Sequence, residues 1–361
     1  MPADYNAITQ RNRLELGTDL KSRRTQISLY SDPAHFVYEL LQNADDHGAS
    51  TISFCLSHDR LIVEHNAKEL FTSRHVEAIS SFENSTSEGQ DLLKVGTFGL
   101  GFKSVFAITS TPRIFCGDES FEIFDLYSLR ELPKPMDLPH AITRFELPFN
   151  HQATCPEFIF PQHRKSEEEA YRTIFDKLST IDPVLLLFTR SLSSITVTTP
   201  TCSNTLARSF GTDGQIILRS DTSESSYRIW QRPISWEGRE KKPVQIAIRL
   251  DESDCPMATD EPLVVLFPTK LETGMRIILN GPYRTTPSRE NVGYRDPYNT
   301  FLIYETAQLL HETLLAERKL GRLSLAFLDL LPLESSLSPQ RELFRPLHEA
   351  ARTLVGLPPW N

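Results

Sequence analysis

A short polar pattern near the N-terminus has residue types and spacing that suit phosphate chemistry. The segment ELLQNADD (39–46) places Glu39 and Asn43 four residues apart, so on a helix both side chains project from one face. Asp46 continues this polar stripe, on the side away from Phe36 and Leu40. A carboxylate can orient and deprotonate water, and an amide oxygen can bind Mg²⁺. Because the same spacing is common on surface helices, the pattern alone indicates only a candidate.

A glycine-rich segment follows further along the chain. The string GTFGLGFKS (96–104) places three glycines ahead of an apolar helix start. Glycines let backbone N–H groups approach phosphate oxygens, and a helix N-terminus favours an anion. Lys103, in the first turn, could contact a phosphate as well. The segment is neither a P-loop nor a dinucleotide fingerprint, and by itself a structural turn is the simpler interpretation.

The two patterns together, in this order, resemble the GHKL ATPases, the superfamily of DNA gyrase, the ninety-kilodalton heat-shock chaperone, MutL and the histidine kinases. ELLQNADD resembles their N-box, and VGTFGLGFKSVF resembles their second glycine box. The polar segment 83–94 between them is typical of a mobile loop and resembles the lid of the family. DPAHFVYELLQNADDHGA and HNAKELF are most similar to the sacsin-type branch. Weaker similarity continues through ITRFELPF (142–149) and through 166–199.

The resemblance implies an ATP site that uses Mg²⁺. Glu39 would be the general base, Asn43 the Mg²⁺ ligand, and Asp46 an acid on the nucleotide side of the helix. The other residues implied at the nucleotide come from the glycine box and the end of the second strand: His65, Asn66, Gly96, Thr97, Phe98, Gly99, Leu100, Gly101, Phe102 and Lys103.

The sequence departs from the superfamily at the end of that strand. Most members have Asp-x-Gly-x-Gly there, with the Asp accepting a hydrogen bond from the adenine amino group. Here His65 stands at the Asp position and Ala67 at the first Gly. The sacsin-type branch often has His-Asn-Gly, so His65 is less unusual within it. A neutral histidine accepts through only one nitrogen, which leaves adenine selectivity open.

Two basic residues in the C-terminal half are further candidates. In the family, a loop of the following domain brings a cation to the terminal phosphate, where it stabilises developing charge. Ser-Arg-Glu (288–290) resembles the loop that does this in the heat-shock chaperone, which makes Arg289 a candidate catalytic residue. Lys270 precedes a turn and resembles the lysine of MutL or gyrase. Either residue could instead lie on ordinary surface.

Periodicity and turn residues predict an α+β chain. Asp32-Pro33 is typical of a helix start and Gly48 of its end, and helices are also expected at 6–20, 166–179 and 300–319. The apolar run 184–188 fits either the end of a buried helix or a buried strand. Strands are expected at 51–56, 60–64, 112–117, 121–126, 142–147 and 195–199, and then at 205–210, 214–219, 226–231, 243–249, 262–267 and 275–279.

The length and the polar stretch 200–204 favour two domains. The expected arrangement is a GHKL helix-on-sheet sandwich over 1–200 and a second α/β domain over 201–361, which would resemble a middle or transducer domain. The chain has 361 residues and a net charge of −9, which argues against a dedicated nucleic-acid surface. No apolar run could span a bilayer, the start lacks a signal peptide, and the five scattered cysteines lack the spacing of a zinc site. These features predict a cytoplasmic protein with no membrane partner.

The leading functional hypothesis is a slow Mg-ATPase that acts as an ATP-driven conformational switch, in chaperone-like remodelling or in a signalling or antiviral defence assembly. Its partners would be ATP and ADP, a protein client or partner subunits, and a second copy in a homodimer. The alternative is a module that senses nucleotide without hydrolysing it. A histidine-kinase role ranks lower, because no phosphoacceptor hairpin precedes the N-box, and a DNA role of the gyrase or MutL kind draws no support from the charge. Sacsin-type proteins usually continue beyond such a module, so an output domain outside this chain stays open.

Overall fold

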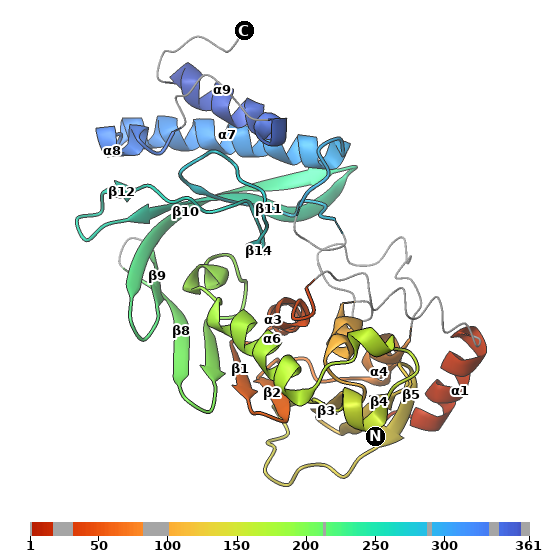
Figure 1. Cartoon of the computed structure of the whole chain (residues 1–361). Coiled ribbons are helices and arrows are strands. Elements are labelled where there is room, and N and C mark those ends of the chain that lie inside the picture. The colour runs from red at the N-terminus through yellow and green to blue at the C-terminus, as the bar shows by residue number, and fades with distance from the viewer. Residues whose placement is uncertain are drawn as a thin grey trace. The chain divides into compact units, whose positions relative to one another are not determined.

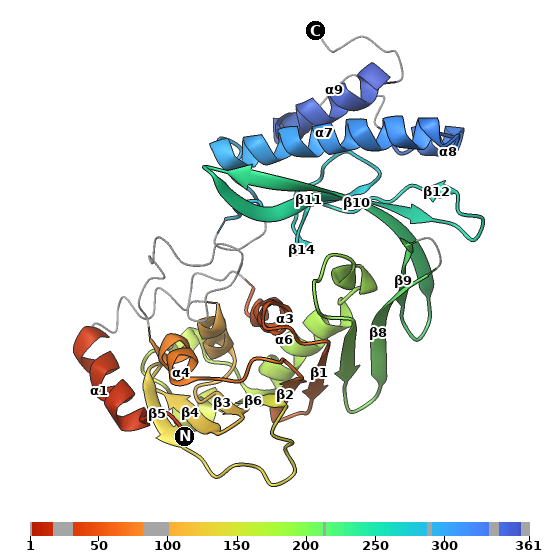
Figure 2. The same cartoon turned by 180° about the vertical axis from the view of Figure 1, so that it is seen from behind.

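The computed structural model describes residues 2–16, 32–81, 101–211, 214–286, 291–331 and 339–354. The chain divides into two compact units, Met1–Ala207 and Arg208–Asn361, which Figures 1 and 2 show from opposite sides. The division falls inside strand β8 (Ser203–Phe210). Each unit is a sheet with helices and is described by itself.

The first unit contains a mixed sheet in the order β8-β7-β1-β2-β6-β3-β4-β5. Strands β1 and β7 run parallel, and the other neighbours are antiparallel. The remaining strands are β1 (Thr51–Leu56), β2 (Arg60–His65), β3 (Arg113–Cys116), β4 (Glu119–Phe124), β5 (Ser128–Glu131), β6 (Thr143–Pro148) and β7 (Ser194–Thr198). All but β5 were predicted from the sequence, with shifts of one or two residues at their ends.

Alternating burial along the central strands sets which face the helices cover. In β1, Ile52, Phe54 and Leu56 are buried, whereas Thr51 and Cys55 are exposed. The same alternation runs through β2, β6 and β7. Because successive side chains of a strand point to opposite faces, only one face of this part of the sheet carries a core.

The helices of the first unit include the predicted N-box helix. It is α3 (Phe36–Asp46), and it starts later than predicted because 32–35 form a turn in which Asp32 accepts from the Ala34 N–H. The apolar run 184–188 proves to be a 3₁₀-helix. The other helices are α1 (Tyr5–Leu16), α4 (Ser73–Ser80), η1 (Phe102–Ala107), α5 (His151–Thr154), η2 (Pro161–His163), α6 (Glu167–Ser179) and η3 (Pro183–Leu187).

The second unit contains a sheet in the order β14-β13-β15-β11-β10-β9, with β12 paired to β11. A long β10–β11 hairpin dominates it (Figure 1) and turns at Glu237 and Gly238, which both have positive φ. The predicted strand 262–267 is broken in two at Leu266, where φ is also positive. The strands are β9 (Ile216–Arg219), β10 (Glu224–Trp236), β11 (Arg239–Leu250), β12 (Pro256–Met257), β13 (Val264–Val265), β14 (Phe267–Pro268) and β15 (Ile278–Asn280).

Helix α7 (Pro297–Lys319) covers the β10–β11 hairpin, and α9 (Arg345–Leu354) packs on α7. Shorter helices are α8 (Leu325–Leu328) and η5 (Pro339–Phe344). The shared core includes Ile246 from the sheet, Leu310 from α7 and Leu347 from α9. The predicted α+β class of the chain is therefore confirmed. In the described ranges, no helix combines the length and apolar character that crossing a membrane requires.

Candidate functional site

Helix α3 is buried on its polar side as well as on its apolar side. Its apolar stripe, which includes Phe36, Leu40 and Ala44, is at most 2% exposed. Glu39 is only 3% exposed and Asn43 only 6%. Buried polar side chains need partners or ligands, because leaving them unsatisfied costs free energy. The surroundings of this polar stripe therefore decide what the helix can do.

The Glu39 carboxylate is held between a histidine and a glycine. Its Oε1 lies 3.3 Å from Nε2 of His35, one helical turn earlier, and His35 is itself only 7% exposed. On the other side, a Cβ built on Gly101 would lie 2.7 Å from Cδ of Glu39 and would overlap its Oε2. The last glycine of the glycine-rich segment is thus packed directly against the Glu39 carboxylate. Two segments far apart in the sequence meet at one point.

Gly101 is a glycine because of this contact and not because of its backbone conformation. Its φ of −61° and ψ of −46° are helical values that any residue adopts. A side chain there would meet Glu39, so the close approach requires the missing Cβ. The other predicted phosphate-contacting residues, Gly96, Thr97, Phe98, Gly99 and Leu100, lie outside the described residues.

Asn43 offers a polar group with no hydrogen-bond partner among the described residues. In the described part of the chain, its side-chain amide makes no hydrogen bond, although the residue is 6% exposed. It lies one turn after Glu39 on the same helix. An amide oxygen beside a carboxylate suits Mg²⁺, which prefers oxygen ligands. The donor set and the close approach of Gly101 therefore fit a magnesium-bound phosphate.

The two aspartates that end α3 have different surroundings. Asp46 is half-buried, and its Oδ2 lies 3.5 Å from Nε2 of Gln42. Asp45 is 2% exposed and accepts from the backbone N–H groups of Arg190, Ser191 and Leu192 at 3.0, 2.7 and 2.9 Å. Sequence analysis did not identify Asp45. Its partners are backbone N–H groups far away in the chain, and no residue type in the sequence reveals such donors.

Two residues predicted to contact a nucleotide, His65 and Asn66, lie at the end of β2. His65 is 6% exposed, and its Nδ1 accepts from the Ala67 N–H at 3.2 Å. Burial, aided by the charge of nearby His47, lowers the pKa of His65 to about 4. His65 is therefore neutral near pH 7, and with Nδ1 as acceptor its ring hydrogen sits on Nε2.

The side chain of Asn66 has a structural role. Its Oδ1 accepts from the N–H groups of Ser50 and Thr51, both at 2.9 Å, and its Nδ2 donates to Ser50 Oγ at 2.8 Å. These bonds tie the end of β2 to the start of β1. They account for Asn66 without a ligand, and its predicted contact with a nucleotide stays a prediction.

Lys103 is directed into the protein. The residue is 3% exposed, and its Nζ donates to the backbone oxygens of Ser80 at 3.2 Å and Leu126 at 2.7 Å. Burial lowers the pKa of Lys103 to about 7. Its neighbour Phe102 packs on Phe145 of β6, with ring centroids 5.7 Å apart. Both side chains anchor η1 to the core, so any phosphate contact of this stretch would come from its backbone.

The two basic candidates belong to the second unit, and the described residues do not test their roles. Lys270 follows β14 and is exposed. Arg289 lies outside the described ranges. Their predicted roles at a terminal phosphate therefore stay predictions.

Comparison with known proteins finds similarity to sacsin-related sequences. The Sacsin domain matches residues 19–134, a range that includes the segments 39–46 and 96–104. The chain is similar to Protein NO VEIN of Arabidopsis thaliana, at 24% identity over 370 residues that cover 91% of this chain and 13% of that protein. It is also similar to human sacsin, at 33% identity over 108 residues that cover 25% of this chain and 2% of that protein. These similarities support a sacsin-like family, and the chain spans a small part of each relative's length.

Proposed function

We propose that the first unit is a Mg-ATP-binding module of the GHKL kind that hydrolyses ATP slowly and works as a conformational switch. The observation that carries this proposal is the contact between Gly101 and Glu39. A phosphate-binding glycine segment and a general base are useful only if they meet, and here no side chain separates them. The resemblance of both segments to the GHKL boxes supports the same assignment.

In this proposal Glu39 takes the proton from the attacking water. The imidazole of His35, 3.3 Å away, orients the carboxylate. Asn43 would hold the Mg²⁺ ion through its side-chain oxygen, and the ion would supply charge neutralisation at the phosphates. The backbone N–H groups of the glycine segment would bind the phosphate oxygens, since Lys103 is engaged with two carbonyl groups.

His65 would read the base differently from the aspartate of other GHKL proteins. An aspartate accepts from the adenine amino group, whereas the Nε2–H of His65 can only donate. We therefore expect discrimination between purine bases to be weaker than in proteins that keep the aspartate. Comparing ATP with GTP in a binding assay tests this expectation.

For the cellular task of the switch we propose only a general class. Closure over ATP and reopening after hydrolysis would alter contacts to a protein client or a partner subunit, as in chaperone-like remodelling or a signalling assembly. Arg289 is the proposed cation from the second unit, with Lys270 as its alternative. Arg289→Ala should lower turnover while leaving ADP affinity nearly unchanged, and full activity in this variant would remove the assignment.

The test of the proposal combines binding and turnover. Calorimetry of the full chain with Mg²⁺ and a non-hydrolysable ATP analogue should show saturable binding that Asn43→Ala weakens. Glu39→Ala should keep binding and lose turnover by about 10²-fold or more. Gln152→Ala, on the exposed helix α5, is a control that should change neither. Wild-type binding without turnover would favour a nucleotide sensor, and no binding would end the proposal.

A further inference from the structure

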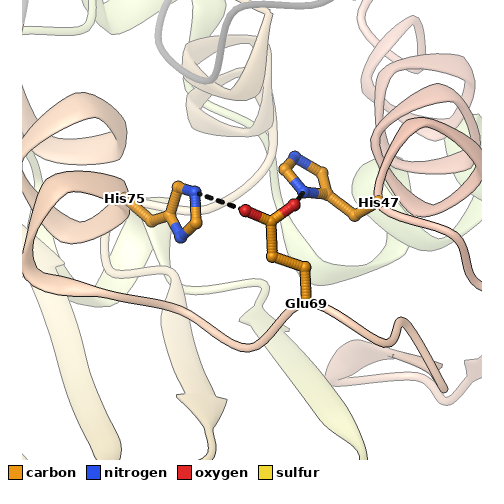
Figure 3. Close-up of side chains that lie close together, drawn as sticks. All are labelled: His47, Glu69 and His75. Atoms are coloured by element: carbon orange, nitrogen blue, oxygen red, sulfur yellow. Dashed lines mark hydrogen bonds and ion pairs between the residues drawn. The ribbon is translucent and has the colours of Figure 1, made fainter.

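Three side chains with metal-binding atoms converge beside the end of α3. His47 follows that helix directly, Glu69 lies between β2 and α4, and His75 is in the first turn of α4. Figure 3 shows the two imidazoles on either side of the Glu69 carboxylate. His47 Nδ1 lies 2.9 Å from Glu69 Oε2, and His75 Nε2 lies 3.6 Å from Glu69 Oε1. One such atom from each residue lies within 4.8 Å of the others.

We infer that His47, Glu69 and His75 bind a divalent transition-metal ion, with Zn²⁺ as the representative. Two imidazoles and one carboxylate form a familiar donor set for zinc, and a fourth position stays open to water. Zinc bonds of about 2.0–2.1 Å place the donors of a tetrahedral site roughly 3.3 Å apart. The two imidazoles now face different oxygens of Glu69, at 2.9 and 3.6 Å, and one donor atom from each of the three residues lies within 4.8 Å of the others. Enclosing an ion therefore requires side-chain rotations that turn one Glu69 oxygen and the two imidazole nitrogens toward a common point.

Burial and the local field favour a cation at this point. The side chain of His47 is 8% exposed and that of His75 is 20% exposed, whereas Glu69 is 47% exposed. The imidazoles are thus held by the fold, and the carboxylate leaves a path to solvent. His47 is the C-cap of α3. The C-terminus of a helix carries partial negative charge, so it attracts a positive ion.

The hydrogen bonds of His75 allow the required tautomer. Its Nδ1 now accepts from the exposed Thr72 N–H at 3.1 Å. Binding a metal through Nε2 moves the ring hydrogen to Nδ1, which can then donate to Thr72 Oγ1, 3.4 Å away. Water can replace the lost bond to the exposed N–H. A histidine ligand usually donates its other ring N–H to such a partner, which fixes the ring.

The ion at this cluster would differ from the magnesium proposed at Asn43. Imidazole nitrogens suit zinc, copper, nickel and iron, whereas Mg²⁺ prefers oxygen ligands. The site would link the end of α3, the segment after β2 and the start of α4. It would therefore serve as a structural crosslink, and its formation does not depend on nucleotide binding.

The test titrates the full chain with Zn²⁺ after treatment with a chelator, in excess Mg²⁺ and a phosphine reductant. We expect about one high-affinity zinc ion per chain, and a loss of at least about tenfold in affinity in both His75→Gln and Glu69→Gln. The matched control is His140→Gln. His140 Nε2 lies 3.6 Å from Asp118 Oδ1 in an exposed pair, and the metal cluster does not include it. This variant should bind zinc like the wild type.

Two further measurements need no variant. Zinc should raise the thermal midpoint of the wild-type chain, because an ion that binds only the folded state stabilises it. The Co²⁺-substituted protein should lack thiolate-to-cobalt charge-transfer absorption, which separates this cluster from the exposed cysteines Cys55, Cys155, Cys202 and Cys255. Zinc binding that is absent, unchanged in both ligand variants, or marked by thiolate absorption would overturn the inference.

Discussion

Because Gly101 lies against Glu39, whether Gly101→Ala raises or lowers the free energy of unfolding should depend on the residue at position 39. Gly101 has helical φ and ψ, so Gly101→Ala would ordinarily stabilise the fold by about 0.5–1 kcal/mol, since alanine loses less backbone entropy. Here the new Cβ would lie 2.7 Å from Glu39 Cδ. A carboxylate is the far end of a flexible chain and can move. Glu39 is 3% exposed and beside His35, however, so moving it disrupts a packed site.

We therefore expect Gly101→Ala to destabilise the wild type by about 1–2 kcal/mol, the lower part of the range for overpacking. In a Glu39→Ala background the obstacle is gone, and the same substitution should stabilise by about 0.5–1 kcal/mol. The double-mutant cycle should then give a coupling free energy of roughly 1.5–3 kcal/mol between the two positions. The displaced carboxylate should also reduce any ATP turnover in the single Gly101→Ala variant.

Urea unfolding followed by circular dichroism measures the cycle. All three tryptophans, Trp230, Trp236 and Trp360, belong to the second unit, so their fluorescence follows that unit as an internal reference. Gly293→Ala is the matched control, because a Cβ there would approach nothing closer than Asp296 Cβ at 3.6 Å. Additive free energies, with coupling below about 0.5 kcal/mol, would refute the contact and with it the meeting of the two segments.

Three further predictions concern buried ionisable side chains. Asp45→Asn should lower the free energy of unfolding by about 2–4 kcal/mol in urea, because three backbone donors lose a charged acceptor, and Asp46→Asn should cost less than about 1 kcal/mol. Burial lowers the pKa of His151 to about 4, so the unfolded chain binds more protons between pH 4 and 6.5 and stability falls as the pH drops through that window. His151→Leu should remove up to about 3 kcal/mol of this fall, and an unchanged pH profile would contradict the assignment. The pKa of about 7 at Lys103 predicts stability that rises from pH 7 toward 10.5; Lys103→Met should abolish that rise, roughly 5 kcal/mol at most, in unfolding measured across this range.

Local patterns predicted most of the secondary structure because they depend on near neighbours. The period of two in 51–56 and 60–64 and the helical period with Gly48 as its end were sufficient for β1, β2 and α3. The hairpin strands β10 and β11 are longer than the predicted 226–231 and 243–249. The added part of β10 contains Pro233, a residue that argues against a strand interior, and the register shifts there. The added start of β11, 239–242, is entirely charged. The short strand β5 was missed for a similar reason, since its second half is exposed.

The part of the candidate site that depends on spacing along one helix could be predicted from the sequence. The parts in which distant segments come together could not. Glu39 and Asn43 were expected on one helical face, and both are buried on α3. Nothing in the sequence indicated that Lys103 would turn inward to the carbonyls of Ser80 and Leu126. Nor could spacing reveal the three-way cluster of His47, Glu69 and His75, whose members come from three separate segments.

The three hydrogen bonds that Asp45 accepts from successive backbone N–H groups restrict how α3 can move. The end of the helix is bound to the chain just before β7, and the next residues are bound again, with Ser193 N–H donating to the Ser50 oxygen at 2.9 Å. Near the start of the helix, Asp32 accepts from the Ala34 N–H and from Lys177 Nζ. A helix that is fixed at one end can still rotate about that end. A displacement of α3 that keeps the three bonds of Asp45 would be a rotation about that residue, and it would move Phe36 further than Glu39.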